Sequence, residues 1–476
     1  MQLRPYQTDL VVELRDGFRT GVRRQLLVSP TGSGKTVLFS WMTASAASRG
    51  SKTWILAHRA EILDQISATL TQAGQDHGVI RSGFAPDPTK IVQVASVQTL
   101  VRRMESIGRP NFIVIDEAHH AAAGSWERIL AHCGREAAVL GVTATPQRLD
   151  GRGLGLYFDK IVMGPSVQSL IEQGYLSKPV YYAPKRIVDL SKVSRRAGDY
   201  STEELEEILN RREVLSNHVG EWLQHANGAR TVVFCVDLAH CESVRGEFES
   251  RGVRASIIDG TLEPEARRLR IESLKNGSVP VLISCNLISE GFDLPAVGAA
   301  LLLRPTLSLA LHLQQVGRAL RPAPGKERAL ILDCVGNTLR HGLAEEEREW
   351  SLEGRAKRKR DALPVRQCSQ CYRVFTSAHC PDCGPVRREA AEGINQVNDC
   401  LAKLPAYGTP EWKRVMAMKR VAKMKEQGAA RTFEDLVELG KKRGYPRPYA
   451  WASNILRFRE GKGLRPGQLR FNPIRQ

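Results

Sequence analysis

Residues Ser29 to Thr36, Ser-Pro-Thr-Gly-Ser-Gly-Lys-Thr, have the composition of a phosphate-binding loop. An apolar strand at 25–28 precedes them and an apolar stretch at 37–42 begins a helix, which is the context that such a loop requires. Backbone N–H groups and the helix N-terminus attract a polyphosphate. Lys35 is expected to reach the β- and γ-phosphates, and the Thr36 hydroxyl to bind Mg²⁺. The predicted nucleotide-binding residues are Thr31, Gly32, Ser33, Gly34, Lys35 and Thr36. A glycine-rich turn is the alternative, because Ser29 stands where the pattern has glycine.

Two adjacent carboxylates, Asp116 and Glu117, follow an apolar strand at 111–115. Bringing both to the end of a hydrophobic strand is costly unless a cation binds there. Asp116 is expected to hold Mg²⁺ through water, and Glu117 to polarise the attacking water, as phosphoryl transfer needs. The alternative is an acidic cap at a helix N-terminus.

Two arginines, Arg318 and Arg321, lie one turn apart on the same face of a predicted helix. Two cations this close repel each other unless an anion lies between or beside them. The pair therefore indicates an anion site, with a surface ion-pair network as the alternative.

Four cysteines form two Cys-x-x-Cys pairs, Cys368 with Cys371 and Cys380 with Cys383. This spacing suits tetrahedral Zn²⁺, and so small a module has too little core to fold without metal. Because no acid or base accompanies the cysteines, the predicted zinc site is structural. The alternatives are redox pairs, disulfides, or His379 as a replacement ligand.

Apolar strands alternate with helices in two successive units, which indicates α/β domains with parallel sheets. Polar residues follow the strands, at the sheet edge where such folds bind ligands. The first unit has expected strands at 25–28, 52–57, 91–95, 111–115 and 138–142. The second unit, which lacks a phosphate loop, has expected strands at 230–236, 256–258, 279–284 and 329–333.

The net charge of +18 is concentrated in the C-terminal quarter of the chain. Residues 351–476 contain 27 Lys and Arg against 12 Asp and Glu, whereas residues 1–350 contain 42 and 39. The tail is therefore expected to bind a polyanion or an acidic protein partner. A cytoplasmic protein is expected, because the sequence shows no signal peptide, no membrane span and six scattered cysteines typical of a reducing compartment.

Four segments resemble successive motifs of superfamily 2 helicases with the DEAH signature: Arg4-Pro5-Tyr6-Gln7, Pro30 to Thr36, Asp116-Glu117-Ala118-His119 and Thr143-Ala144-Thr145. The resemblance implies two RecA-like domains with ATP between them. It gives Gln7 the task of reading the adenine edge, for which an amide has one donor and one acceptor. It implies that His119, Thr143, Thr145 and Gln314 couple hydrolysis to movement.

The stretch Gln314 to Arg321, Gln-x-x-Gly-Arg-x-x-Arg, resembles the last motif of the superfamily. This implies that Arg318 and Arg321 cross a cleft to the γ-phosphate. Gly291 and Asp293 match the motif that touches nucleotide and nucleic acid. The residues expected to contact the backbone of the nucleic-acid strand are Arg59, Thr99 and Thr261.

Residues 1–342 are also similar to the RadD-like bacterial and phage helicases, through Arg304-Pro305-Thr306, Ala323-Pro324-Gly325-Lys326 and Val335-Gly336-Asn337. This implies a motor that acts on DNA in repair, recombination or phage replication. The alternatives are an RNA helicase, a duplex translocase that does not separate strands, and a nucleotide-gated scaffold without turnover.

The predicted architecture is α/β, with two tandem RecA-like parallel-sheet domains at residues 1–165 and 166–345. A basic linker at 346–366, the zinc module at 367–386 and a basic helical tail at 387–476 follow. In the tail, Trp451 is expected to belong to a core rather than to a base-stacking surface.

Metal analysis of the purified chain should find one Zn²⁺ per molecule, released by chelators or thiol-modifying reagents. Cys371→Ser should unfold the zinc module because it removes one of four ligands, and should leave nucleotide binding largely intact. A metal-free preparation with a fully ordered 367–386 segment would count against the site.

Overall fold

The computed structural model describes residues 2–120, 124–146, 153–184, 190, 193–196, 199–285 and 297–358, and in the C-terminal part 366–367, 374–375, 401–403, 409–410, 412, 427, 430, 432–442, 448–449, 451–453 and 455–456. Both large sheets belong to one compact unit, and the C-terminal helix α14 (Phe433–Lys442) belongs to another.

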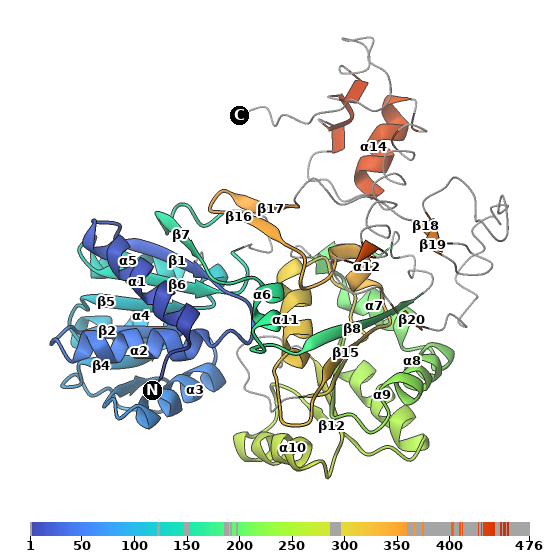
Figure 1. Cartoon of the computed structure of the whole chain (residues 1–476), viewed down its shortest axis with the longest axis horizontal. Coiled ribbons are helices and arrows are strands. Elements are labelled where there is room, and N and C mark those ends of the chain that lie inside the picture. The colour runs from blue at the N-terminus through green and yellow to red at the C-terminus, as the bar shows by residue number, and fades with distance from the viewer. Residues whose placement is uncertain are drawn as a thin grey trace. The chain divides into compact units, whose positions relative to one another are not determined.

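Seven parallel strands form the first sheet, in the order β3-β4-β2-β5-β6-β1-β7 (Figure 1). The strands are β1 (Arg24–Val28), β2 (Thr53–Ala57), β3 (Gly78–Ile80), β4 (Val92–Ser96), β5 (Phe112–Asp116), β6 (Ala138–Thr143) and β7 (Lys160–Met163). The helices are α1 (Pro5–Arg19), α2 (Lys35–Ala47), α3 (Ala60–Gln72), α4 (Val97–Arg103) and α5 (Gly124–Cys133), with short 3-10 turns η1 (Met104–Ser106) and η2 (Ala118–His120).

Helices cover both faces of this sheet, so its strands are apolar on both sides. Side chains alternate between the faces along each strand. On β2, Trp54 and Leu56 pack with α4 and α5, whereas Ile55 packs with α1, α2 and α3. Because both faces of the sheet are covered by apolar cores, polar functional groups can lie only at the ends of the strands.

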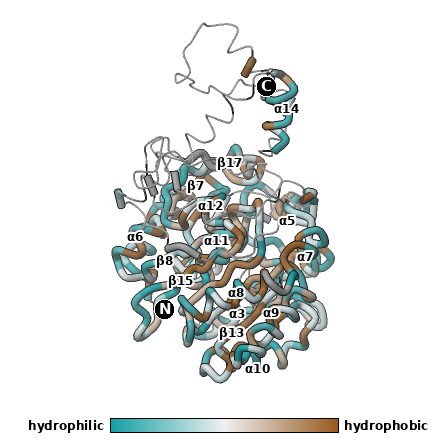
Figure 2. Tube along the Cα trace, turned by 90° about the vertical axis from the view of Figure 1, so that its right-hand side faces the viewer, coloured by the Kyte–Doolittle hydropathy of each residue, from teal (hydrophilic) through white to brown (hydrophobic). Residues whose placement is uncertain are grey.

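The second sheet has the order β12-β13-β11-β14-β15-β8-β20, with β20 antiparallel and the others parallel. Its strands are β8 (Lys178–Pro184), β11 (Thr231–Cys235), β12 (Ala255–Ile258), β13 (Val281–Cys285), β14 (Ala299–Leu302), β15 (Arg328–Asp333) and β20 (Leu401–Lys403). The helices of this region are α6 (Val167–Glu172), α7 (Thr202–Leu209), α8 (Arg212–His225), α9 (Leu238–Ser250), α10 (Pro264–Asn276), α11 (Leu309–Ala319) and α12 (Asn337–His341). Hydrophobic stretches such as β15 run through the interior (Figure 2).

Three pairs of short antiparallel strands lie outside the two sheets among the described residues. They are β9 (Arg195–Arg196) with β10 (Asp199–Tyr200), β16 (Arg348–Ser351) with β17 (Gly354–Arg358), and β18 (Arg366–Gln367) with β19 (Val374–Phe375).

The expected pair of α/β units with parallel sheets is confirmed, and the nine expected strands all form within two residues of their predicted ends. Strands β3, β7, β8 and β14 were not expected. β3 is only three residues long, and β8 lies between the two predicted runs of strands, the last of the first unit at 138–142 and the first of the second unit at 230–236.

Two C-terminal expectations differ from the structure. The predicted basic linker at 346–366 contains the β16–β17 hairpin, which packs on the first sheet's core through Trp350 and Leu352, with Gly155 N–H donating to Leu352 O at 2.9 Å. The predicted helical tail contains the strand β20, because its backbone pairs with the edge strand β8.

The C-terminal unit has a small core of its own. Leu436 and Val437 of α14 pack with Ala452 and Ile455, and Trp451 packs against them, as expected.

The scattered cysteines are thiols wherever the structure describes them. Cys133, Cys235, Cys241 and Cys334 are buried and Cys285 is half-buried. Within the described residues, no helix has the length and apolar character needed to cross a membrane.

Candidate functional site

The phosphate-binding loop lies between β1 and α2, and its glycines are required by the backbone. Gly32 and Gly34 have φ of +87° and +76°, which side-chain-bearing residues rarely adopt. A Cβ at Gly34 would lie 2.7 Å from Gln7 Nε2, and one at Gly32 would lie 2.9 Å from Leu176 Cδ2. The loop is therefore enclosed by its neighbours as well as strained.

Ser29, which departs from the usual glycine, is buried and has a structural role. Its hydroxyl donates to Ser33 Oγ at 2.7 Å, and its N–H donates to Thr143 O at 2.9 Å. These bonds tie the loop to the end of the neighbouring strand β6. The serine thus stabilises the loop conformation that the pattern predicts.

Lys35 begins α2, and its ammonium donates to Ser29 O and Pro30 O, both at 3.1 Å. Burial lowers the pKa of Lys35, while the carboxylates Glu117 and Asp116 raise it and Arg318 and Arg321 lower it further. Lys35 therefore interacts electrostatically with four other charged groups, in a cluster of three cationic and two anionic side chains.

Asp116 ends β5, and its carboxylate is almost fully buried. Burial, and then the adjacent Glu117 charge, raise the pKa of Asp116 to about 7, whereas Lys35 lowers it. A bound divalent cation would favour the charged form.

Glu117 has φ of +48°, the one left-handed φ among the described non-glycine residues. Such a conformation costs about 1–3 kcal/mol and is typical of functional positions. His119 Nδ1 lies 3.4 Å from Glu117 Oε2 and 3.0 Å from Thr143 Oγ1. Since the Thr143 hydroxyl donates to Thr145 O at 2.9 Å, we infer that His119 Nδ1 carries its hydrogen and donates. The structure thus joins His119, Thr143 and Thr145 to Glu117.

Helix α11 of the second sheet approaches the phosphate-binding loop closely. A Cβ at Gly317 would lie 2.6 Å from Thr31 Cβ, so glycine is needed for this contact. Arg318, next in the helix, is 4% exposed, and Arg321 Cγ would lie 3.8 Å from a Cβ at Gly32. Gln314 is buried, and among the described residues its Nε2 has no hydrogen-bond partner.

This arrangement fits ATP with Mg²⁺. Strained glycines open backbone N–H groups at the N-terminus of α2, and Lys35, Arg318 and Arg321 supply positive charge for phosphates. Asp116 and Glu117 supply hard oxygen ligands, and Gln314 Nε2 is an unused buried donor.

Gln7 is buried against the loop rather than simply facing a ligand. Its Nε2 donates to Gly34 O at 3.1 Å and Ser33 O at 3.3 Å, and its Oε1 accepts from Arg4 N–H at 2.9 Å. Tyr6 adds a bond from its hydroxyl to Ser33 O at 2.6 Å. The adenine assignment for Gln7 stays a prediction, and the structure adds a loop-holding role.

The residues predicted to contact the nucleic-acid backbone follow β-strands at the same edge of their sheets as the predicted catalytic residues. Arg59 follows β2, Thr99 lies in α4 after β4, and Thr261 follows β12, with its hydroxyl and N–H donating to Asp259 Oδ1 at 2.5 and 2.6 Å. An ion pair between Glu61 of α3 and Arg267 of α10 joins the Arg59 and Thr261 segments.

The side chains that support these contacts are not identifiable from the sequence alone. Trp126 Nε1 donates to His58 Nε2 at 2.8 Å, and Gln98 Nε2 lies 3.5 Å from His58 Nδ1. The polar strand ends His58 and Gln98 are visible in the sequence, but their partner Trp126 belongs to a distant helix. Tyr175, whose ring lies 4.5 Å from the Arg4 guanidinium carbon, gave no sequence signal.

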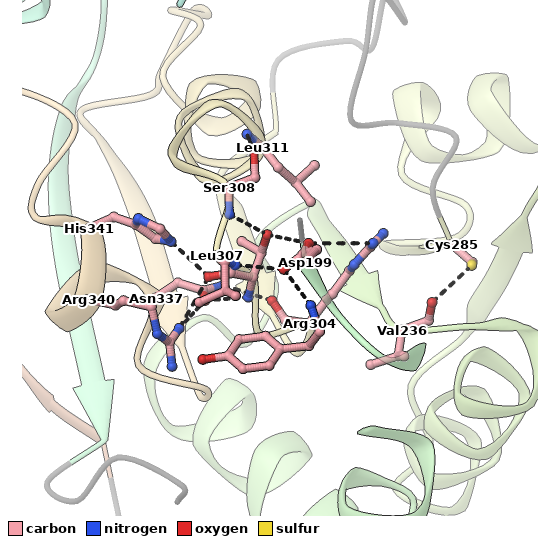
Figure 3. Close-up of polar contacts among 12 residues, drawn as sticks. Asp199, Val236, Cys285, Arg304, Leu307, Ser308, Leu311, Asn337, Arg340 and His341 are labelled. Atoms are coloured by element: carbon pink, nitrogen blue, oxygen red, sulfur yellow. Dashed lines mark hydrogen bonds and ion pairs between the residues drawn. The ribbon is translucent and has the colours of Figure 1, made fainter. Parts of the chain in front are cut away.

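A polar network at the carboxyl ends of the second sheet links the segments that suggested the RadD-like resemblance (Figure 3). Thr306 N–H donates to Asn337 Oδ1 at 3.0 Å, and Asn337 Nδ2 donates to Arg304 O at 2.8 Å. Asp199 accepts from the Thr306 hydroxyl and the Leu307 N–H, both at 2.7 Å. The network fixes the entry to α11, which carries Arg318. The predicted placement of both arginines on one helix is wrong, because α11 ends at Ala319 and Arg321 lies just beyond its C-cap, Leu320.

Gly291 and Asp293, and the four predicted zinc ligands Cys368, Cys371, Cys380 and Cys383, lie outside the described residues. Their assignments stay predictions.

Comparisons with known proteins identify both halves of this site. Residues 1–148 match the family described as "Type III restriction enzyme, res subunit", and residues 197–323 match the "Helicase conserved C-terminal domain". The "51.5 kDa protein" of a Lactococcus phage is 32% identical over 365 residues, 75% of this chain and 77% of that protein. The "Putative ATP-dependent helicase IRC3" of Saccharomyces cerevisiae is 32% identical over 332 residues, 66% of this chain and 48% of that protein.

The chain belongs to the superfamily 2 helicases. It is therefore an enzyme of the ATPase/helicase class. The fold agrees, because a solved fragment of a "putative HsdR subunit of a type I restriction enzyme" from Vibrio vulnificus has a TM-score of 0.56 at 23% identity, covering 71% of this helicase and 65% of that chain. The helicase spans about half the length of its yeast relative.

Gly34→Ala should weaken binding of Mg²⁺·ATP by the helicase at least ~10-fold, a change of about 1.4 kcal/mol. The new methyl group would meet Gln7 Nε2 in a backbone held at φ of +76°. Gly50→Ala is the matched control, because Gly50 has φ of +77° and nothing within 4 Å of its Cβ position. Both variants should lose about 1–2 kcal/mol of unfolding free energy from the left-handed backbone.

Titration with a fluorescent ATP analogue, together with thermal unfolding, separates the two effects. Equal nucleotide affinities for the two variants would show that the contact with Gln7 does not shape the loop.

Proposed function

We propose that this helicase is an ATP-dependent DNA helicase or translocase of the RadD-like, DEAH-bearing group. The observation that carries the proposal is the contact of α11 with the phosphate-binding loop, which brings Arg318 and Arg321 to the same charge cluster as Lys35, Asp116 and Glu117. A pure binding protein would not need a strained carboxylate beside these cations.

In the proposed reaction, Mg²⁺ supplies positive charge to the phosphate oxygens when it is bound. Lys35 would hold the phosphates, and the Thr36 hydroxyl and Asp116 would hold the ion. Glu117, positioned by His119, accepts a proton from the attacking water. Arg318 and Arg321 stabilise the charge that develops on the transferred phosphoryl group.

The proposed coupling runs through hydrogen bonds to the strand ends. A change at Glu117 reaches Thr143 and Thr145 through His119, and Thr143 O is bonded to Ser29 of the loop. Gln314 lies on α11, so it responds to the same closure. Gly291 and Asp293 are proposed as further nucleotide contacts by resemblance alone.

The choice of DNA over RNA, and of repair, recombination or phage replication as the process, follows from the RadD-like resemblance. Cytoplasmic location, a structural Zn²⁺ at the paired cysteines and a protein partner for the tail are parts of the same proposal.

The experiment that tests the substrate measures the ATPase rate with single-stranded DNA, duplex DNA, forked DNA and RNA in parallel. Strand separation is then measured on whichever nucleic acid stimulates the ATPase. Stimulation by RNA alone, or stimulation without separation, would favour an RNA helicase or a duplex translocase.

Glu117→Gln should lower ATP hydrolysis about 10²–10⁴-fold, the usual contribution of a positioned base. ATP and nucleic-acid binding should persist, because the amide preserves the side chain's shape. Lys35→Ala is the comparison, and should weaken ATP binding as well. Steady-state ATPase and nucleotide titration measure the two effects, and near wild-type turnover by Glu117→Gln would show that Glu117 is not the base.

Removal of residues 405–476, which make up most of the basic tail, should lower affinity for all nucleic acids alike. Truncation after residue 404 keeps the β16–β17 hairpin and β20, and removes 17 Lys and Arg against 6 Asp and Glu. Each lost phosphate contact should flatten the slope of log K against log salt by about 0.9 for duplex or 0.7 for single strands. We expect several units of flattening, with stimulated ATPase retained at high nucleic-acid concentration.

A salt titration of binding by the full chain and by residues 1–404 makes the comparison. Equal slopes would show that the tail's charge faces something else, such as an acidic partner protein.

A further inference from the structure

An exposed aromatic side chain, Phe84, lies at the carboxyl edge of the first sheet. It follows β3, which is next to β4, which is next to β2. The predicted strand contacts Thr99 and Arg59 follow β4 and β2. Adjacent strands lie about 4.8 Å apart, so the ends of these three strands span about 10 Å. Phe84 therefore extends the row of predicted nucleic-acid contacts away from the ATP site.

The turn that carries Phe84 is held rigidly. Phe84 N–H donates to Arg81 O at 3.2 Å, and Gly83 has φ of +81°, as the third residue of a type II turn requires. Arg103 Nη1, at the end of α4, donates to Phe84 O at 2.7 Å. The backbone of the turn is thus fixed to the element that carries Thr99.

The Phe84 ring also has a fixed cationic neighbour. The Arg81 guanidinium carbon lies 4.1 Å from the ring centroid, and Arg81 Nη1 is paired with Asp64 Oδ1 at 2.6 Å. The side chain nevertheless remains 46% exposed. Single exposed apolar residues are common on protein surfaces, but they need no such fixation.

A fixed aromatic ring with an arginine beside it, next to backbone contacts for a strand, is the combination used to bind unpaired bases. We propose that the turn Arg81–Phe84 is a stacking platform for one base of a single strand whose backbone passes Arg59 and Thr99. The platform tolerates any base, because every base has a π-face. This inference rests on the proposed function as a nucleic-acid motor.

The test uses the full chain and fluorescently labelled single-stranded oligonucleotides. Phe84→Ala should weaken binding about 5- to 150-fold, the usual loss of one stacked base. The slope of log K against log salt should not change, because stacking releases no counterions. Phe84→Trp should bind as tightly as the wild type, and the fluorescence of the introduced indole should be quenched on binding.

Two variants sharpen the test. Phe84→Leu keeps an apolar group without a π-face and should bind as poorly as Phe84→Ala. Ile91→Ala is the matched control, because Ile91 is 42% exposed but precedes β4 at the opposite edge of the sheet, and its affinity should equal that of the wild type.

Wild-type affinity for Phe84→Ala, with oligonucleotide-stimulated ATPase intact, would overturn the platform and leave the proposed function standing. Wild-type affinity for Phe84→Leu alone would also overturn it, in favour of an apolar docking surface. A wild-type chain that neither binds oligonucleotides nor is stimulated by them would overturn both the platform and the proposed function.

Discussion

The close approach of helix α11 to the phosphate-binding loop is the contact on which the rest of the site depends. Only a hydrogen at Gly317 leaves room for Thr31, so the helix that carries Arg318 is set directly against the loop that carries Lys35. Without that contact, the two α/β units would hold a phosphate loop and an arginine pair separately. With it, groups from residues 35 to 321 share one electrostatic environment.

This environment is unfavourable for the protein by itself. Burial raises the pKa of Asp116 and lowers that of Lys35, so both groups are held where their charged forms are disfavoured. Glu117 adds a strained backbone conformation. Such costs are typical of sites whose charges match a ligand, because the ligand then supplies the compensating charges. The two cores of the first sheet, which contain Trp54, Ile55 and Trp126, supply the stability that permits this.

Sequence reasoning located the motifs well because each lies where a strand ends. The loop after β1, the carboxylates after β5 and the threonines after β6 are local patterns next to apolar runs, and local patterns are readable without the fold. It failed where a partner comes from far along the chain. Trp126 supports His58, Asp199 supports Thr306, and Trp350 returns to the first sheet's core, and none of these pairs has a sequence spacing that reveals it.

Side-chain tasks were harder to predict than side-chain positions. An amide near the N-terminus suits an adenine edge, yet the Gln7 amide donates to the backbone of the loop itself, a bond that depends on how α1 is oriented. Ser29 looked like a departure from a consensus, yet its hydroxyl bonds Ser33 inside the loop. Gln7 acts on backbone carbonyls and Ser29 on a neighbouring hydroxyl, and the sequence identifies neither partner.

The order of the β-strands explains how ATP hydrolysis and nucleic-acid contact can be connected over a short distance. Strand β5, which ends in Asp116, is paired with β2, which leads to Arg59, and with β6, which leads to Thr143. Neighbouring β-strands are about 4.8 Å apart, so the predicted catalytic carboxylates lie one β-strand from Arg59, a predicted nucleic-acid contact, and one β-strand from Thr143. A displacement of the β5 end therefore acts on both neighbours through the ladder itself. The residues that this arrangement couples in the proposed mechanism lie on adjacent strand ends, even though Arg59 and Thr143 are far apart in the sequence.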